Sequence, residues 1–135
     1  MKVFNFIFFI FISLIPCHFL YAANEWEEYS DQIEILDTDD IKNIVNSRSA
    51  ILLDTWKKDI KPEKLDYKKW MPAQRYSLPG AKWLPNVGLE ILTPELRKYF
   101  KETVERLTKG NKDAKIVCFC RRGYYSKIAA ERLVQ

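Results

Sequence analysis

The residues best suited to take part in a chemical reaction lie together near the end of the sequence. They form the segment Cys120-Arg121-Arg122-Gly123-Tyr124-Tyr125-Ser126. Cysteine reacts as its thiolate, so positive charge close to the sulfur favours its reaction. Arg121 and Arg122 follow Cys120 directly, and they either contact a substrate or remain solvated charges. Gly123 lets the segment turn through backbone angles that a side chain would oppose. The pattern indicates a loop built around a reactive thiol.

The elements expected on either side of this loop would support that chemistry. The apolar run 115–119 predicts a buried strand, and apolar residues recur at helical spacing after Ser126. The start of a helix leaves backbone N–H groups without partners and carries partial positive charge, so it can hold an anion. We therefore expect Ser126 to cap the helix and Cys120 to ionise more easily than a free cysteine.

Spacing within the loop separates two kinds of anion chemistry. A cysteine-based phosphatase needs an arginine six residues after its cysteine, to clamp phosphate through two hydrogen bonds. That position holds Ser126, so phosphatase activity is not expected. The net charge of +4 suits a small anionic substrate. It is too small and too dispersed to indicate nucleic-acid binding.

The first 22 residues have the pattern of a cleavable secretory signal. Lys2 is followed by an apolar stretch and then by Ala22 and Ala23. We expect cleavage after Ala22 and a periplasmic mature protein that does not associate with the membrane. Two alternatives remain: an uncleaved anchor, since the stretch approaches the roughly 20 residues of a membrane span, and a lipoprotein signal ending at Cys17, which Pro16 disfavours.

Loss of the signal would remove His18 and Cys17, and with them several classes of site. The mature chain would contain no histidine and only two cysteines, Cys118 and Cys120. No Ser-His-Asp triad, Cys-His pair or histidine zinc site can be built from such a chain. Two cysteines separated by one residue do not form a four-thiolate metal site. Neither a metal nor another cofactor is expected.

The remaining sequence alternates predicted strands and helices, as its 135 residues would in one domain. Strands are expected at 33–36, 50–54 and 115–119, and helices at 37–45, from 93 to 110, and from Ser126 onward. This alternation indicates an α/β domain with a mainly parallel sheet and flanking helices. Residues 78–85 predict a turn and a short extended segment. Residues 57–77 predict a long loop, either functional or a solvated insertion.

Other notable residues have structural interpretations. Asp54 ends a predicted strand near the loop, and we expect it to order loops through hydrogen bonds. Cys118 lies in an apolar strand and is expected in the core. A disulfide to Cys120 would need a Cα separation near the upper limit of about 6.8 Å. The tryptophans are expected to pack or to anchor loops: Trp26, Trp56, Trp70 and Trp83.

Several segments resemble the rhodanese family. CRRGYYSKIAAERL resembles the rhodanese active-site loop and its helix, ILLDTW its strand ending in Asp, and LPGAKWLP its Pro-Gly-Ala turn. EILDTDDIKNIVNSRSAILLD fits the first strand and helix, so the resemblance covers most of 33–135. It implies a rhodanese-like α/β fold in which Cys120 carries a persulfide and residues 121–126 hold the substrate.

A narrower resemblance links KWMPAQRYSLPGAKWLPNVG, TPELRKYF and ERLTKGN to exported rhodanese-related proteins called PQQ-dependent catabolism-associated CXXCW motif proteins. This chain lacks their motif, because position 123 is Gly and position 124 is Tyr. Rhodanese domains usually continue into another strand after this helix, whereas this sequence stops at Gln135. We therefore expect a short or truncated form, with an exposed sheet edge.

Two functions follow as expectations. The first is a sulfurtransferase that takes sulfur from thiosulfate or a similar anionic donor and passes it to a thiophilic acceptor. The second is a non-catalytic accessory or binding module of the same fold, associated with exported redox proteins.

Overall fold

The computed structural model describes residues 32–135. Their elements follow in the order α1 (Thr38–Ser47), β1 (Ile51–Asp54), β2 (Lys82–Trp83), α2 (Pro94–Thr108), β3 (Ile116–Phe119) and α3 (Tyr124–Leu133). The expected signal peptide and Trp26 lie outside the described residues. Within 32–135, no helix is long and apolar enough to cross a membrane.

The three strands form one parallel sheet in the order β2-β1-β3. Leu53 pairs with Lys82 on one side and with Cys118 on the other. The next residue, Asp54, pairs with Trp83 and Phe119. The carboxyl ends of all three strands therefore meet at one end of the sheet. This arrangement confirms the expected α/β class with a parallel sheet.

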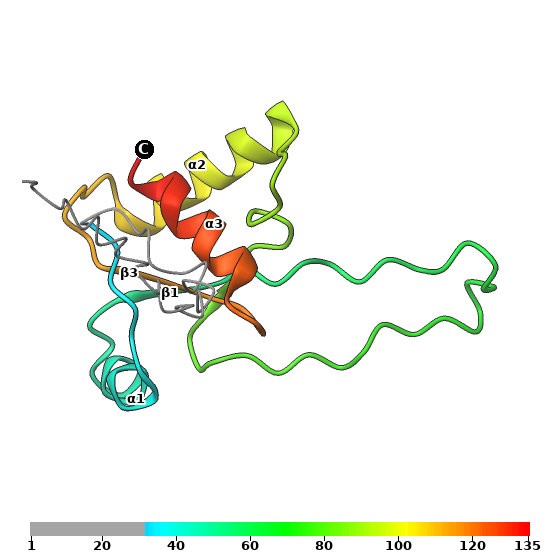
Figure 1. Cartoon of the computed structure of the whole chain (residues 1–135), viewed down its shortest axis with the longest axis horizontal. Helices are drawn as coiled ribbons and strands as arrows, with labels where there is room; N and C mark the ends of the chain where they lie inside the picture. Colours follow the sequence, from blue (N-terminus) through cyan, green and yellow to red (C-terminus); the bar gives the residue numbers. More distant parts are fainter. Residues whose placement is uncertain (1–31) are drawn as a thin grey trace, which may run out of the picture.

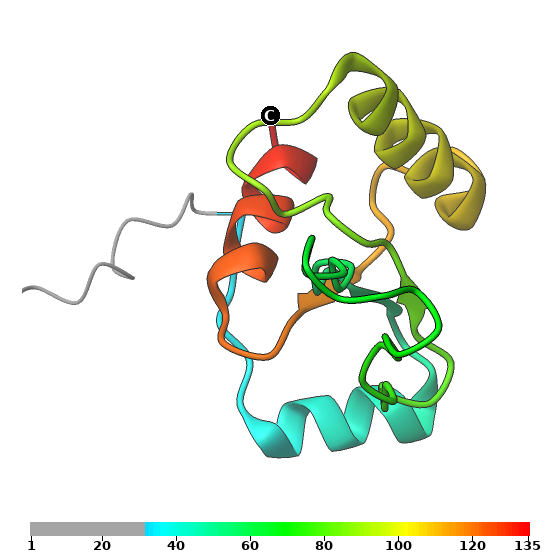
Figure 2. The ribbon, with the colours of Figure 1, turned by 90° about the vertical axis from the view of Figure 1, so that its right-hand side faces the viewer.

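Helices cover both faces of the sheet. α1 lies on one face, and α2 and α3 lie on the other (Figures 1 and 2). The main core forms beneath α2 and α3, where Leu53 packs with Phe100 and Ala129, together with Leu84 and Val87. Because side chains alternate along a strand, the neighbouring Leu52 faces α1 instead. α1 itself contributes no buried residue.

The ends of α1 and α2 follow from local side chains. The Asp37 carboxylate accepts hydrogen bonds from the first turn of α1, and the Asp40 carboxylate accepts one from the Asp37 N–H. Thr93 caps α2, which has Pro94 at its first position. α2 ends where Lys109 and Gly110 both adopt left-handed backbone angles. Both helices were expected from these residues.

The predicted strand at 33–36 is wrong. This segment is irregular, with Ile33 and Leu36 half-buried and Glu34 and Ile35 exposed. It does not join the sheet beside β3, although both segments line the same cavity. β3 is consequently an edge strand of the described sheet. Of its three apolar residues, only Ile33 and Leu36 are partly covered.

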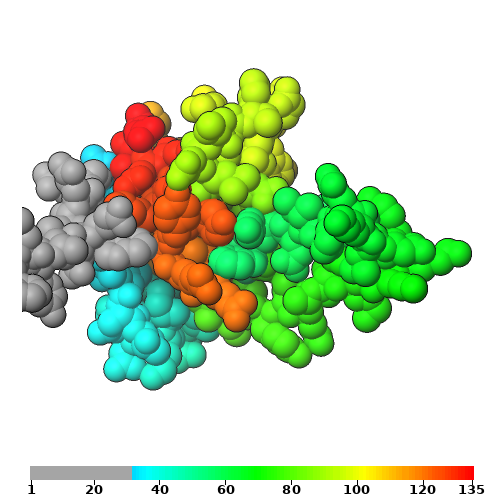
Figure 3. Space-filling view, turned by 45° about the vertical axis from the view of Figure 1, so that its right-hand side comes forward, coloured from blue at the N-terminus to red at the C-terminus, as the bar shows by residue number. Residues whose placement is uncertain are grey.

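Residues 57–76 form an arm that projects from the domain (Figures 1 and 3). They contain turns but no helix or strand, as expected for a long loop. The arm leaves the sheet just after β1. Arg75 and Ser77, at its far end, bind Asp54, the last residue of β1, so both ends of the arm lie near the carboxyl end of β1.

Candidate functional site

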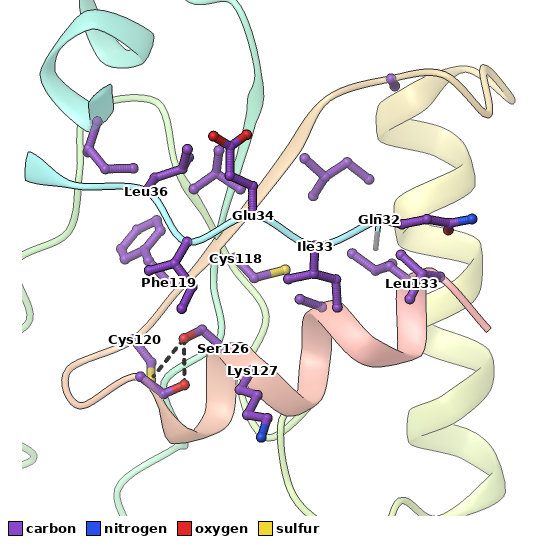
Figure 4. Close-up of a pocket in the computed structure, with 18 of the residues that line it drawn as sticks. Gln32, Ile33, Glu34, Leu36, Cys118, Phe119, Cys120, Ser126, Lys127 and Leu133 are labelled. Atoms are coloured by element: carbon purple, nitrogen blue, oxygen red, sulfur yellow. Dashed lines mark hydrogen bonds between the residues drawn. The ribbon is translucent and has the colours of Figure 1, made fainter. Parts of the chain in front are cut away.

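Cys120 follows β3 immediately and begins the loop that leads into α3. Its Sγ lies 3.6 Å from Ser126 Oγ, as a donor to the hydroxyl oxygen. Ser126 Oγ in turn donates to the Gly123 carbonyl at 2.8 Å (Figure 4). The structure therefore brings together Cys120, Gly123 and Ser126, three residues of the predicted site.

Ser126 does not cap α3, contrary to the expectation from sequence. The helix begins at Tyr124, two residues earlier than predicted, and Gly123 is its N-cap residue. Ser126 lies inside the first turn, where its hydroxyl bonds back to the carbonyl three residues earlier. Its second contact is the Cys120 sulfur, so the hydroxyl binds the thiol and does not cap the helix.

Gly123 sets the direction of the loop. Its φ of 82° lies in the left-handed region, which confirms the expectation that glycine is needed there. The first backbone hydrogen bond of α3 runs from Lys127 N–H to the Gly123 carbonyl. The N–H groups of Tyr125 and Ser126 consequently have no acceptor within the helix, and they lie at its positive end.

A cavity of about 690 Å³ extends between β3, α3 and residues 32–36. Cys120, Gly123 and Ser126 line one end, and Leu133 and Val134 line the other. Figure 4 shows the Cys120 and Ser126 side chains close to each other beside the first turn of α3. The volume falls in the range of about 300–1,000 Å³ that is typical of small-molecule sites. Cys120 thus lines an open space whose walls are both polar and apolar.

The other predicted loop residues divide into two pairs. Arg121 and Arg122 are exposed, and Arg122 also lines the cavity. The aromatic rings of Tyr124 and Tyr125 pack edge to face, with centroids 5.4 Å apart. Tyr125 makes a similar contact with Trp56 at 5.6 Å, at the base of the arm. The arginines leave their charges on the exposed side of the loop, whereas the tyrosines pack around the start of α3.

The turn at 87–90 fixes α3 from the opposite side. Arg132 donates to the carbonyls of Val87 at 2.6 Å, Leu89 at 2.5 Å and Glu90 at 2.8 Å. The Tyr124 hydroxyl donates to the Glu90 carboxylate. Gly88 approaches Tyr125 so closely that a Cβ at Gly88 would overlap the Tyr125 backbone. Sequence patterns gave no sign of this turn, because its contacts are mostly to backbone atoms.

Asp54 organises the base of the arm, as expected. Its carboxylate is 3% exposed and accepts from Arg75 at 2.5 Å, from Ser77 Oγ at 2.9 Å and from Trp56 N–H at 3.0 Å. The Arg75 guanidinium lies over the Trp83 ring, 4.3 Å from its centroid. Neither Arg75 nor Ser77 could be singled out from sequence, since both lie in an irregular segment more than 20 residues from Asp54.

Trp83 completes the anchoring of the arm. Its indole N–H donates to the Trp56 carbonyl at 2.9 Å. Trp56 and Trp83 therefore anchor loops, which confirms the structural interpretation of these tryptophans. Trp70 is half-buried within the arm.

Cys118 lies two residues before Cys120, and both cysteines are half-buried and line the same cavity. Cys118 packs against the main core from β3, and its thiol points toward the space between Ile33 and α3 (Figure 4). Burial raises the pKa of the Cys118 thiol to about 12, and the charge of a Cys120 thiolate acts in the same direction. Both cysteines are free thiols. Cys118 therefore stays protonated at neutral pH, as a core residue would.

Comparisons with protein families, curated proteins and solved structures find no match. Within residues 32–135, no group of three or more His, Cys, Asp or Glu residues is arranged to hold a metal ion. The candidate site therefore consists of the Cys120 thiol, its hydroxyl neighbour Ser126, the helix start and the adjoining cavity.

Proposed function

We propose that this chain is an exported, rhodanese-like sulfurtransferase in which Cys120 carries the transferred sulfur. The single observation that supports this most is the Cys120 thiol 3.6 Å from Ser126 Oγ, at the start of α3 and at one end of a cavity. A nucleophile, a hydroxyl and helix N–H groups suit a sulfur that becomes anionic during reaction.

The reaction would proceed in two steps. The Cys120 thiolate attacks the outer sulfur of thiosulfate, the S–S bond of thiosulfate breaks, and sulfite leaves with the electron pair. A thiophilic acceptor such as cyanide then attacks the outer sulfur of the Cys120 persulfide. The S–S bond breaks again, thiocyanate is released, and the Cys120 thiolate is restored.

Three sets of groups would stabilise the persulfide anion. The Ser126 hydroxyl can turn from the Gly123 carbonyl toward the sulfur, since both acceptors lie within its reach. The N–H groups at the start of α3 supply further donors. Arg121 and Arg122 supply positive charge from the exposed side of the loop.

The test is persulfide formation on the purified mature protein. Incubation with thiosulfate should add the mass of one sulfur to Cys120, and cyanide should remove it as thiocyanate. Cys120→Ser should abolish turnover, because a hydroxyl cannot hold the transferred sulfur, whereas Cys118→Ala should retain it. A monodisperse protein that gains no sulfur in excess thiosulfate would contradict the proposal for this donor.

The second candidate function is a non-catalytic binding module associated with exported redox proteins. The observations that favour it are the open edge of β3 and the projecting arm, both of which can contact other proteins. Loss of Cys120 would leave such a role unchanged, so the Cys120→Ser variant distinguishes the two functions.

A further inference from the structure

The surplus positive charge of the chain is concentrated in the 57–76 arm, contrary to the expectation that it is dispersed. Seven of its residues are lysine or arginine and three are aspartate or glutamate. This surplus of four positive charges equals the net charge of the whole chain, +4. The rest of the sequence is therefore neutral on balance. An anionic partner would be attracted to the arm in preference to other surfaces.

Large apolar side chains of the arm are also uncovered. Ile60 is 86% exposed, and Met71 and Tyr76 are each 84% exposed. The backbone hydrogen bonds at the tip of the arm form only local turns, such as those from Leu65 N–H to the Pro62 carbonyl and from Trp70 N–H to the Asp66 carbonyl. The arm thus leaves these apolar groups available for contact with another molecule.

The base of the arm is fixed beside the candidate site. Arg75 and Ser77 bind the Asp54 carboxylate, and Asp54 pairs across the sheet with Phe119, the residue before Cys120. Trp56, at the other root of the arm, contacts the Tyr125 ring in the first turn of α3. In Figure 3 the arm (green) projects beside the start of α3 and its preceding loop (orange). A molecule bound along the arm would therefore lie near Cys120.

We propose that the 57–76 arm, together with exposed Arg121 and Arg122, is the docking surface for an acidic protein whose cysteine accepts sulfur from Cys120. This inference rests on the proposed sulfurtransferase function. The acceptor thiolate attacks the outer sulfur of the persulfide, and the S–S bond to Cys120 breaks. Cys120 leaves as a thiolate with the electron pair, and the acceptor cysteine becomes the persulfide.

The character of the arm favours a protein over a lipid surface. A helix that binds lipid separates its apolar and cationic residues onto two faces. The arm is not helical, and its lysines alternate with apolar residues along an irregular path. Aromatic residues, Met and Arg are enriched in protein interfaces, and complementary charge accelerates the encounter of two proteins.

A disulfide-exchange assay tests docking without any sulfur donor. The probe is a synthetic peptide with one cysteine, held as a mixed disulfide with thionitrobenzoate and flanked by glutamates. Its control carries glutamines instead. Cys120 thiolate attacks the peptide sulfur and releases the thionitrobenzoate anion, whose absorbance gives the rate. Rates with free iodoacetamide correct for the intrinsic reactivity of each protein variant, and rates with free cysteine correct for that of each peptide.

The wild-type protein should react about tenfold faster with the glutamate peptide at low ionic strength, and this preference should fall in high salt. The preference should largely disappear in a variant with four arm lysines changed to glutamine: Lys57, Lys64, Lys68 and Lys69. A matched variant removes the same charge from α2 and the residues after it, and should keep the preference: Lys98, Lys101, Lys109 and Lys115. Cys120→Ser supplies the blank.

Equal rates with the two peptides, or equal losses in the two lysine variants, would overturn the docking surface. A protein that forms no persulfide from thiosulfate contradicts the proposed function instead. Because the exchange assay needs no persulfide, the two failures are distinguishable.

Discussion

At the scale of single residues, two cysteines two positions apart have opposite roles. Cys118 belongs to β3 and packs against the core, whereas Cys120 lies beyond the end of the strand. The alternation of a strand cannot explain this difference, since both positions fall on the same side. The difference arises because the chain leaves the sheet between them.

Alkylation should distinguish the two thiols. Only the thiolate reacts, and burial raises the pKa of Cys118 to about 12, so its thiolate is scarce at pH 7–9. Iodoacetamide should modify Cys120 faster over this range. The rate at Cys118 should rise continuously with pH, without a plateau below about pH 11. Mass spectrometry of the wild-type, Cys118→Ala and Cys120→Ser proteins gives each rate. Equal alkylation rates at Cys118 and Cys120 would argue against Cys120 as the reactive residue of the site.

Ser126 provides the second prediction at this scale. If its hydroxyl donates to the persulfide anion, Ser126→Ala removes a hydrogen bond to a charged group, worth about 1.5–3 kcal/mol. Turnover of thiosulfate and cyanide should fall roughly 10- to 100-fold. Ser126→Thr keeps the hydroxyl and should restore most of the rate. Wild-type turnover in the Ser126→Ala variant would show that the Ser126 hydroxyl does not stabilise the persulfide.

At the scale of elements, the sequence predicted those whose signals are local. Asp37 and Thr93 placed the starts of α1 and α2, and the apolar runs around Leu53 and Val117 placed β1 and β3. Residues 33–36 had the pattern of a strand, but pairing depends on a neighbouring strand, and this segment does not join the sheet beside β3.

The same distinction applies to the candidate site. Cys120 and Gly123 were evident because their chemistry and backbone freedom are intrinsic to the residue type. Arg75 and Arg132 were not evident, because their partners lie 21 or more positions away in the sequence. Long-range contacts of this kind are set by the assembled fold. Neither the periodicity of apolar residues nor the spacing of motif residues predicts them.

The contact of Gly88 with α3 gives a prediction at the element scale. Gly88→Ala would force a Cβ into the Tyr125 backbone, shift the start of α3 and move Ser126 away from Cys120. We expect a stability loss of about 1–3 kcal/mol and a clear loss of turnover in the folded protein. Gly110→Ala is the control. It strains a left-handed residue that has open space around it and that precedes β3, whereas the loop follows β3.

Urea unfolding and turnover, measured on the same preparations, test this pair. Gly110→Ala should lose about 1–2 kcal/mol and retain the turnover of its folded fraction. If Gly88→Ala also retains full turnover once its folded fraction is taken into account, the 87–90 turn does not position the site.

At the scale of the whole molecule, the packing is unequal on the two faces of the sheet. The main core lies under α2 and α3, around Leu53, Phe100 and Ala129. Within residues 32–135, the helix on the opposite face is α1, which buries no residue. A second cavity of about 600 Å³ lies on that side, lined by Ile44, Val45 and Leu52 among others. The loop at Cys120, which leads into α3, therefore depends for its stability on the packing of α2 and α3 against one face of the sheet.

Leu52 and Leu53 test this asymmetry, because they are identical neighbours in β1 that face opposite sides. Leu53 is fully buried in the main core, so Leu53→Ala should cost about 2–5 kcal/mol, a large part of a typical total stability of about 5–15 kcal/mol. Leu52 already adjoins a cavity, so its truncation removes fewer contacts and should cost clearly less. Urea unfolding monitored by tryptophan fluorescence measures both. Equal losses would mean that α1 packs as tightly against the sheet as α2 and α3 do.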